Sequence, residues 1–165
     1  MERALMAGGL IEQVSPTQIA GWVSQNDVAY PEVVLKVNGS RVARTRAIEM
    51  VDRGEFGQVQ QFFLNIKMLW DFVGPSDVLS VWAGDEELFT ADGAAPVAAE
   101  AGERDVPELL ALIEGGHVFN KKGGLQLSKL LNTQWQQEVL ATFDTLKART
   151  RELMGLDLFP CYGTL

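Results

Sequence analysis

Hydrophobic and polar positions along this chain follow two different periods, and the change falls near residue 93. In residues 8–93, short apolar runs alternate with polar positions and turn signals, which is the two-residue period of half-buried β-strands. The strands that this pattern predicts are residues 10–14, 18–24, 32–37, 41–48, 61–66, 77–83 and 88–90. Strands this short and closely spaced predict an antiparallel β-sandwich-like module or a barrel.

Turn signals separate the predicted strands. Residues 15–17, Ser-Pro-Thr, separate the first two strands, and Asn38-Gly39 joins the third to the fourth. Asn-Gly is the strongest short hairpin signal, because both central residues of a type I′ turn need a positive φ. We expect a short helical turn in residues 67–74 and a tight turn at residues 85–87.

Aromatic residues are the natural core of this module. We predict that Trp22, Phe63, Trp82 and Phe89 are buried, each contributing about 1.5–3 kcal/mol. Gly21, which precedes Trp22, is expected to permit a bend in its strand.

The pattern changes after the predicted strands. Residues 94–104 are rich in Ala and Pro and have no period, so we predict a semi-flexible linker. A helix is expected to start at Asp105, with Glu108 completing a capping box, and to end at Gly115. Residues 117–124 are expected to form a loop or hairpin.

A longer helix is predicted to follow this hairpin. Thr133 and Gln136 form a second capping-box pattern, and Gly155 is a C-terminal signal. Apolar residues recur along the helix at helical spacing, namely Trp135, Val139, Phe143, Leu146 and Leu153. Few residues follow that would cover this stripe, so we expect exposed apolar surface on the helix. The fold class is therefore α+β, with a sandwich-like module, a linker and a helical segment in residues 105–165.

Composition and charge narrow the class of partner. The chain has 165 residues and a formal net charge of −8 at pH 7, with the acidic excess concentrated before residue 93. Because binding to phosphate backbones needs a basic face, nucleic acid is not an expected partner. No run of residues approaches the roughly 20 apolar positions that a transmembrane segment needs. One cysteine, Cys161, and no evident secretory signal predict a cytoplasmic protein.

Several side chains are candidates for binding. Arg44 and Arg46 share one face of a predicted strand, and with Arg41 they are candidates to contact an anionic glycan or lipid headgroup. The alternative is a solvated surface, which is the commoner role of such a group. Tyr30 and Trp70 are candidates for stacking on a sugar ring, the alternative being packing in the core or a loop.

For two other residues we favour a structural role over a catalytic or metal-binding one. His117 is the only histidine and lacks neighbours at metal-ligand spacing, so we expect a loop histidine. Cys161 has no nearby base to activate it, so we expect a structural thiol. Gly163 and Thr164 are candidates for binding a phosphate, because backbone N–H groups and a hydroxyl group after a strand can hold one.

The end of the chain resembles the LicD/fukutin-related family. Residues 152–165 read Glu-Leu-Met-Gly-Leu-Asp-Leu-Phe-Pro-Cys-Tyr-Gly-Thr-Leu. In the family, a helix leads into a strand and a Tyr-Gly-Thr-Leu-Leu-Gly turn, and an Asp-rich segment that binds a divalent metal follows. Tyr162, Gly163, Thr164 and Leu165 match the start of this turn. The resemblance implies that residues 105–165 begin a nucleotidyltransferase-like domain that is truncated here.

The family also implies an activity for the parent protein. Its members are phosphotransferases that add phosphocholine or phospho-alditol groups to surface glycans. The resemblance implies that Tyr162, Gly163 and Thr164 bind a substrate phosphate. It also implies a divalent metal such as magnesium in the full-length parent. The implied substrates are a nucleotide-activated donor and, as acceptor, a surface or capsular polysaccharide. The chain lacks the metal-binding carboxylates, so we expect this fragment to be non-catalytic and to hold no cofactor.

A second hypothesis is that the chain is a non-enzymatic module. The β region resembles small sandwich modules attached to bacterial glycosyltransferases, on residues 19–23, Ile-Ala-Gly-Trp-Val, and on residues 33–41. Such a module would bind carbohydrate or another protein. Self-association through the uncovered helical stripe remains open under both hypotheses.

Overall fold

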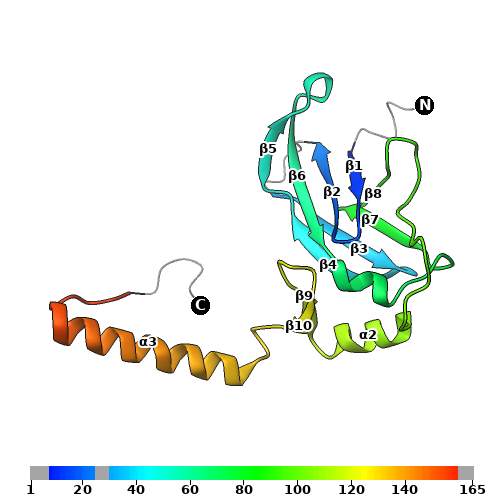
Figure 1. The fold of residues 1–165 in the computed structure, drawn as a ribbon. Coiled ribbons are helices and arrows are strands. Elements are labelled where there is room, and N and C mark those ends of the chain that lie inside the picture. The colour runs from blue at the N-terminus through cyan, green and yellow to red at the C-terminus, as the bar shows by residue number, and fades with distance from the viewer. Residues whose placement is uncertain (1–7, 25–29, 160–165) are drawn as a thin grey trace. The chain divides into compact units, whose positions relative to one another are not determined.

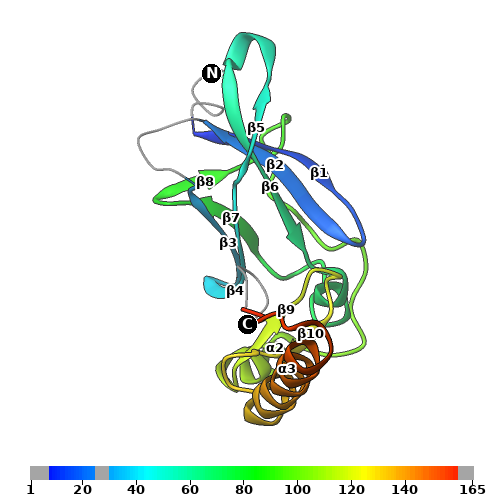
Figure 2. The same ribbon diagram turned by 90° about the vertical axis from the view of Figure 1, so that its left-hand side faces the viewer.

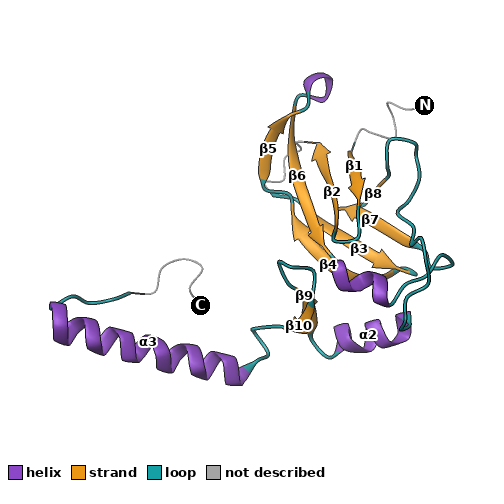
Figure 3. Cartoon of the chain, in the orientation of Figure 1, coloured by secondary structure: helices purple, strands orange, loops and turns teal. Residues whose placement is uncertain are grey.

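The computed structural model describes residues 8–24 and 30–159. The chain divides into two compact units, residues 1–126 and 127–165. Among these described residues, the first unit holds a two-layer β-sandwich, the α-helix α2, two short 3-10 helices and a small hairpin, and the second holds the long helix α3 (Figures 1 and 3). The described chain is therefore α+β and mostly strand.

Two antiparallel four-stranded sheets form the sandwich. The first sheet has the order β1-β2-β6-β5, with β1 Gly9–Val14, β2 Gln18–Ser24, β6 Gln58–Asn65 and β5 Glu49–Asp52. The second sheet has the order β4-β3-β7-β8, with β4 Ser40–Arg46, β3 Glu32–Val37, β7 Leu79–Ala83 and β8 Glu86–Leu88. The two layers face each other in Figure 2. A backbone hydrogen bond of 2.8 Å from Ile11 N to Phe89 O joins them at one edge.

The turn between β3 and β4 has the predicted conformation. Asn38 and Gly39 have φ values of 50° and 83°, so both central residues lie in the left-handed region. The Asn38 side chain also ties the hairpin to the start of β7, because it donates to Asp77 at 2.8 Å and accepts from Val78 N at 2.9 Å.

Inward side chains of both sheets form one hydrophobic core. Its largest fully buried members include Ile19, Phe62, Leu64, Leu35, Leu79 and Phe72. The prediction that Phe63 is in the core is wrong, since Phe63 is 40% exposed and its neighbour Phe62 is fully buried. Trp82 and Phe89 were also predicted to be buried, but both are only half-buried and neither belongs to the core. Trp22 is 1% exposed, but it alternates with the inward Val23 and stacks on Phe56 with ring centroids 5.0 Å apart.

Residues 94–104, the predicted linker, pack along the sandwich. Gly102 N donates to Val73 O at 3.0 Å, and Arg104 N donates to Asp71 O at 2.8 Å. Ala98 is 5% exposed and belongs to the core. The segment is thereby held by backbone hydrogen bonds and burial, and the compact unit continues to residue 126.

The helix α2 spans Val106–Glu114 and closes one end of the sandwich (Figure 1). Asp105 is its N-cap, as predicted, and accepts from Glu108 N at 2.9 Å. The Glu108 carboxylate, predicted to complete a capping box, pairs with Arg104 instead. Leu109 is fully buried.

A two-stranded hairpin of β9 His117–Phe119 and β10 Leu125–Leu127 follows α2. Gly123 in its turn accepts from Met68 N at 2.8 Å, which docks the hairpin on a short 3-10 helix, Lys67–Asp71.

The second unit is built on α3, Thr133–Met154. Its N-cap is Asn132, whose side chain accepts from Trp135 N at 3.0 Å. The predicted capping box of Thr133 and Gln136 is therefore wrong: the N-cap is one residue earlier, and the Gln136 side chain donates to Lys129 O and Leu130 O at 2.8 and 3.0 Å. Gly155 ends α3 with a φ of 67°, as predicted. No helix within the described residues is both long and apolar enough to cross a lipid bilayer.

Candidate functional site

The outside of the second sheet carries the three arginines singled out in the sequence, with a lysine and a tryptophan. Across β3 and β7, Val34 lies opposite Trp82 and Lys36 lies opposite Ser80. Across β3 and β4, Lys36 lies opposite Arg41. The polar and aromatic members of this outward face are Glu32, Lys36, Arg41, Arg44, Arg46, Ser80, Trp82 and Glu87.

A β-bulge in β4 adds Arg41 to the outward face. Leu35 lies opposite Ala43, but the next residue, Lys36, lies opposite Arg41, so β4 has one extra residue, Val42. Val42 is 5% exposed and belongs to the core. Side chains alternate along a regular strand, so without the bulge Arg41 would share the inward side with Ala43. The bulge therefore adds a guanidinium to the two that alternation alone predicts.

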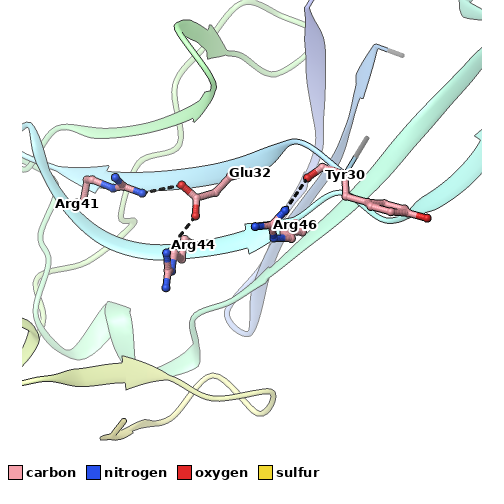
Figure 4. Close-up of polar contacts among 5 residues, drawn as sticks. All are labelled: Tyr30, Glu32, Arg41, Arg44 and Arg46. Atoms are coloured by element: carbon pink, nitrogen blue, oxygen red, sulfur yellow. Dashed lines mark hydrogen bonds and ion pairs between the residues drawn. The ribbon is translucent and has the colours of Figure 1, made fainter. Parts of the chain in front are cut away.

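Glu32 connects two of the arginines (Figure 4). Its carboxylate accepts from Arg41 Nη2 at 2.8 Å and from Arg44 Nη1 at 3.2 Å. The side chains of Arg41 and Arg44 remain 58% and 75% exposed, so both guanidinium groups keep donors that face solvent. Arg46 Nη1 donates to the carbonyl oxygen of Tyr30 at 3.4 Å. Glu32 thus holds two guanidinium groups on one side of the sheet.

Trp82 lies beside these cations. The Lys36 ammonium stands over its ring, with Nζ 4.1 Å from the ring centroid, a cation–π contact. The Trp82 indole nitrogen donates to Ser80 Oγ at 2.9 Å, which sets the orientation of the ring. The ammonium occupies one face of this half-buried ring, so a ligand would meet the part of the ring that Lys36 leaves open.

A cavity of about 330 Å³ lies over this part of the sandwich. Its walls include Glu32, Val34, Lys36, Arg41, Trp82 and Glu86. Its walls thus combine aromatic and aliphatic surface with two cations, Lys36 and Arg41, and two carboxylates, Glu32 and Glu86.

Positive charge is concentrated on one side of the outward face. Strands β3 and β4 carry four cationic side chains and one carboxylate, Glu32. The neighbouring strand β8 carries Glu86, which lines the cavity, and Glu87, which lies opposite Trp82. The whole chain has a formal charge of −8, so this local excess of cations is opposite in sign to the rest of the molecule. A local field of this sign attracts anions.

The other candidate residues lie apart from this cluster. Tyr30 is 51% exposed, and its link to the outward face is its backbone carbonyl rather than its ring. Trp70 packs against the core from the 3-10 helix. His117 begins β9, and its Nδ1 lies 3.1 Å from the carbonyl oxygen of Leu112, near the end of α2. His117 thus makes a local contact, whereas Trp70 also lines a separate cavity of about 510 Å³ beside residues 97–103.

Clear pKa shifts occur away from the outward face. The Thr90 hydroxyl donates to Asp92 and lowers the pKa of that carboxyl, with a smaller effect from Ala94 N. At the start of α2, Arg104 donates to Glu108 and lowers its pKa, and Glu108 raises the pKa of Arg104 in turn. Both sites are turn or helix-start contacts, so we assign them to structure.

The predicted phosphate-binding residues Tyr162, Gly163 and Thr164, and Cys161, lie outside the described residues. Within residues 8–24 and 30–159, no three His, Cys, Asp or Glu side chains come together in a way that would hold a metal ion.

Comparison with known proteins gives no further guide. The chain matches no protein-family model, no curated protein and no solved structure.

Proposed function

We propose that the chain is part of a phosphotransferase of the LicD/fukutin-related family, and that its β-sandwich holds a surface or capsular polysaccharide as the acceptor. The observation that carries the sandwich's role is the outward face, where Trp82 lies among Lys36, Arg41 and Glu32. Sugar rings have apolar faces that lie against aromatic rings, and their hydroxyl groups exchange hydrogen bonds with carboxylate and guanidinium groups.

The transferase part of this proposal depends on the chain's last residues. The Tyr-Gly-Thr-Leu sequence of residues 162–165 supports it through its resemblance to the family's phosphate-binding turn. Phosphoryl transfer relies mostly on positioning and on metal charge. The described residues do not group the carboxylates that such a metal needs, so we assign no catalytic step to them.

Binding of capsular oligosaccharides tests the role of the sandwich. In ¹H–¹⁵N NMR spectra of the intact chain, we expect the indole signal of Trp82, identified by its loss in Trp82→Phe, to move on titration. The indole signal of Trp135 in α3, identified in the same way with Trp135→Phe, serves as the control and is expected to stay in place. An unmoved Trp82 signal at millimolar oligosaccharide contradicts the proposal.

The coding sequence beyond Leu165 tests the family. A Leu-Gly continuation followed by an Asp-rich segment supports a phosphotransferase, and a stop codon directly after Leu165 contradicts it. The second candidate, a carbohydrate-binding module without a transferase, is favoured by the same outward face. Sugar binding together with a stop codon would select it.

A further inference from the structure

We propose that the outward face selects an anionic polysaccharide, one whose sugars carry carboxylate or phosphodiester groups. Lys36 and Arg41 contact the anion, and Trp82 supports the neighbouring sugar ring. This inference rests on the proposed glycan-binding function and names the class of glycan.

Lys36 and Arg41 form a pair of like charges on the outward face. The two residues lie directly opposite each other on adjacent strands, where side chains are about 5 Å apart at Cβ and like charges destabilise the sheet. In the part of the chain that the structure describes, Lys36 makes no ion pair. Glu32 neutralises Arg41 only in part, because it also pairs with Arg44. An anion bound between Lys36 and Arg41 would relieve their repulsion.

Trp82 lies next to this cation pair. The ammonium of Lys36 lies 4.1 Å from the centre of the Trp82 ring, and Val34, which is 9% exposed, lies across from Trp82. Since Val34 is buried, the apolar surface beside the cations is that of the half-buried Trp82 ring. Free phosphate would leave that surface uncovered, whereas an acidic sugar has both an anionic group and a ring.

The volume of the cavity also fits part of a glycan chain. The cavity of about 330 Å³ is at the lower end of the range of roughly 300–1,000 Å³ for small-ligand sites. That space suits one or two sugar units of a longer chain. The exposed guanidinium group of Arg44 lies farther along β4, where it meets the next anionic group of a polymer.

Binding of a matched pair of oligosaccharides to the intact chain tests the inference. The probes are hexagalacturonate, which carries a carboxylate on each sugar, and its methyl ester, which has the same backbone without the charges. We expect the acid to bind at least about tenfold more tightly, the effect of one charge-assisted hydrogen bond. Lys36→Gln and Arg41→Gln are each expected to remove most of this preference. Lys121→Gln makes the same charge change in the β9–β10 turn and is expected to keep it.

Each alternative result has a separate meaning. Equal binding of the acid and the ester would overturn the inference and leave the glycan-binding function standing. Polyphosphate of equal charge, or a single-stranded DNA oligomer, binding as tightly as hexagalacturonate would show a general polyanion surface and would also overturn it. Binding of neither galacturonate, with capsular oligosaccharides also failing to bind, would overturn both proposals. Thermal unfolding of each variant establishes that it is folded.

Discussion

Gly21 lies directly opposite Phe62 in the pairing of β2 with β6, and the phenyl ring occupies the space that a side chain at position 21 would need. A Cβ atom on Gly21 would stand 2.9 Å from Phe62 Cζ and 2.1 Å from the carbonyl oxygen of Leu10. Gly21 therefore allows both β1 and the Phe62 ring to lie close to the backbone of β2.

This contact predicts a large effect of Gly21→Ala. The added methyl group meets backbone on one side and a fully buried ring on the other, so we expect a loss of about 1–3 kcal/mol or more in the free energy of unfolding. Gly74→Ala is the matched control, because its Cβ would be 3.5 Å from its nearest neighbour. Urea unfolding of both variants measures the difference. Equal stability of the two variants would contradict a close approach at Gly21.

The two adjacent phenylalanines of β6 are predicted to differ in their contribution to stability. Phe62 is fully buried and Phe63 is 40% exposed. We expect Phe62→Ala to cost about 3–5 kcal/mol, because it removes a core ring and leaves a cavity, and Phe63→Ala to cost much less. Urea denaturation of the two variants gives the comparison. A larger cost at Phe63 would mean that β6 presents its other side to the core.

Stability is predicted to depend on pH through Glu108. Its hydrogen bond with Arg104 lowers its folded-state pKa below the ordinary 4.5, so the ionised carboxylate stabilises the fold above that value. The contribution is lost as the pH falls through the lowered folded-state pKa.

We therefore expect Glu108→Gln to be less stable than the wild type at neutral pH, with a gap that closes on acidification. Glu114→Gln, at the other end of α2, controls for the change in net charge. Unfolding in urea across the acidic range provides the measurement. A gap that is constant or widens on acidification would refute the assignment.

Apolar surface on α3 is predicted to cause association of this 165-residue chain. No residue of α3 is buried, and Leu146 and Leu153 are 54% and 75% exposed. Buried apolar area stabilises association, so we expect concentration-dependent mass in light scattering or a broad thermal transition. Leu146→Glu with Leu153→Glu should restore a monodisperse species. A monomer that melts cooperatively without these changes would contradict this expectation.

Local sequence signals predicted the order and type of most elements. Strands β2 and β3 and helix α3 have the predicted ranges, because alternation, the Asn38-Gly39 turn and the Gly155 cap act over a few residues. Strand β5 was missed, since its four residues are all exposed or half-buried and lack a clear apolar alternation. The packing of residues 94–104 could not be predicted either, because it depends on backbone hydrogen bonds to Asp71 and Val73, which belong to another part of the chain.

The candidate site was predicted only in part. Alternation placed Arg44 and Arg46 on one face, but the inclusion of Arg41 depends on the bulge at Val42. Lys36 and Trp82 had no signal that linked them, because they are far apart in sequence and meet only when β3 pairs with β7.

By itself, the sequence determined that this protein has a strand-rich first part and a helical second part, because the period of hydrophobic residues is a local property of the chain. Only the tertiary structure decided that Phe62 rather than Phe63 enters the core, and that Arg41, Lys36 and Trp82 share one surface. The physical reason is that register and bulges depend on how separate strands pack together, and a shift of one residue moves every side chain to the opposite face.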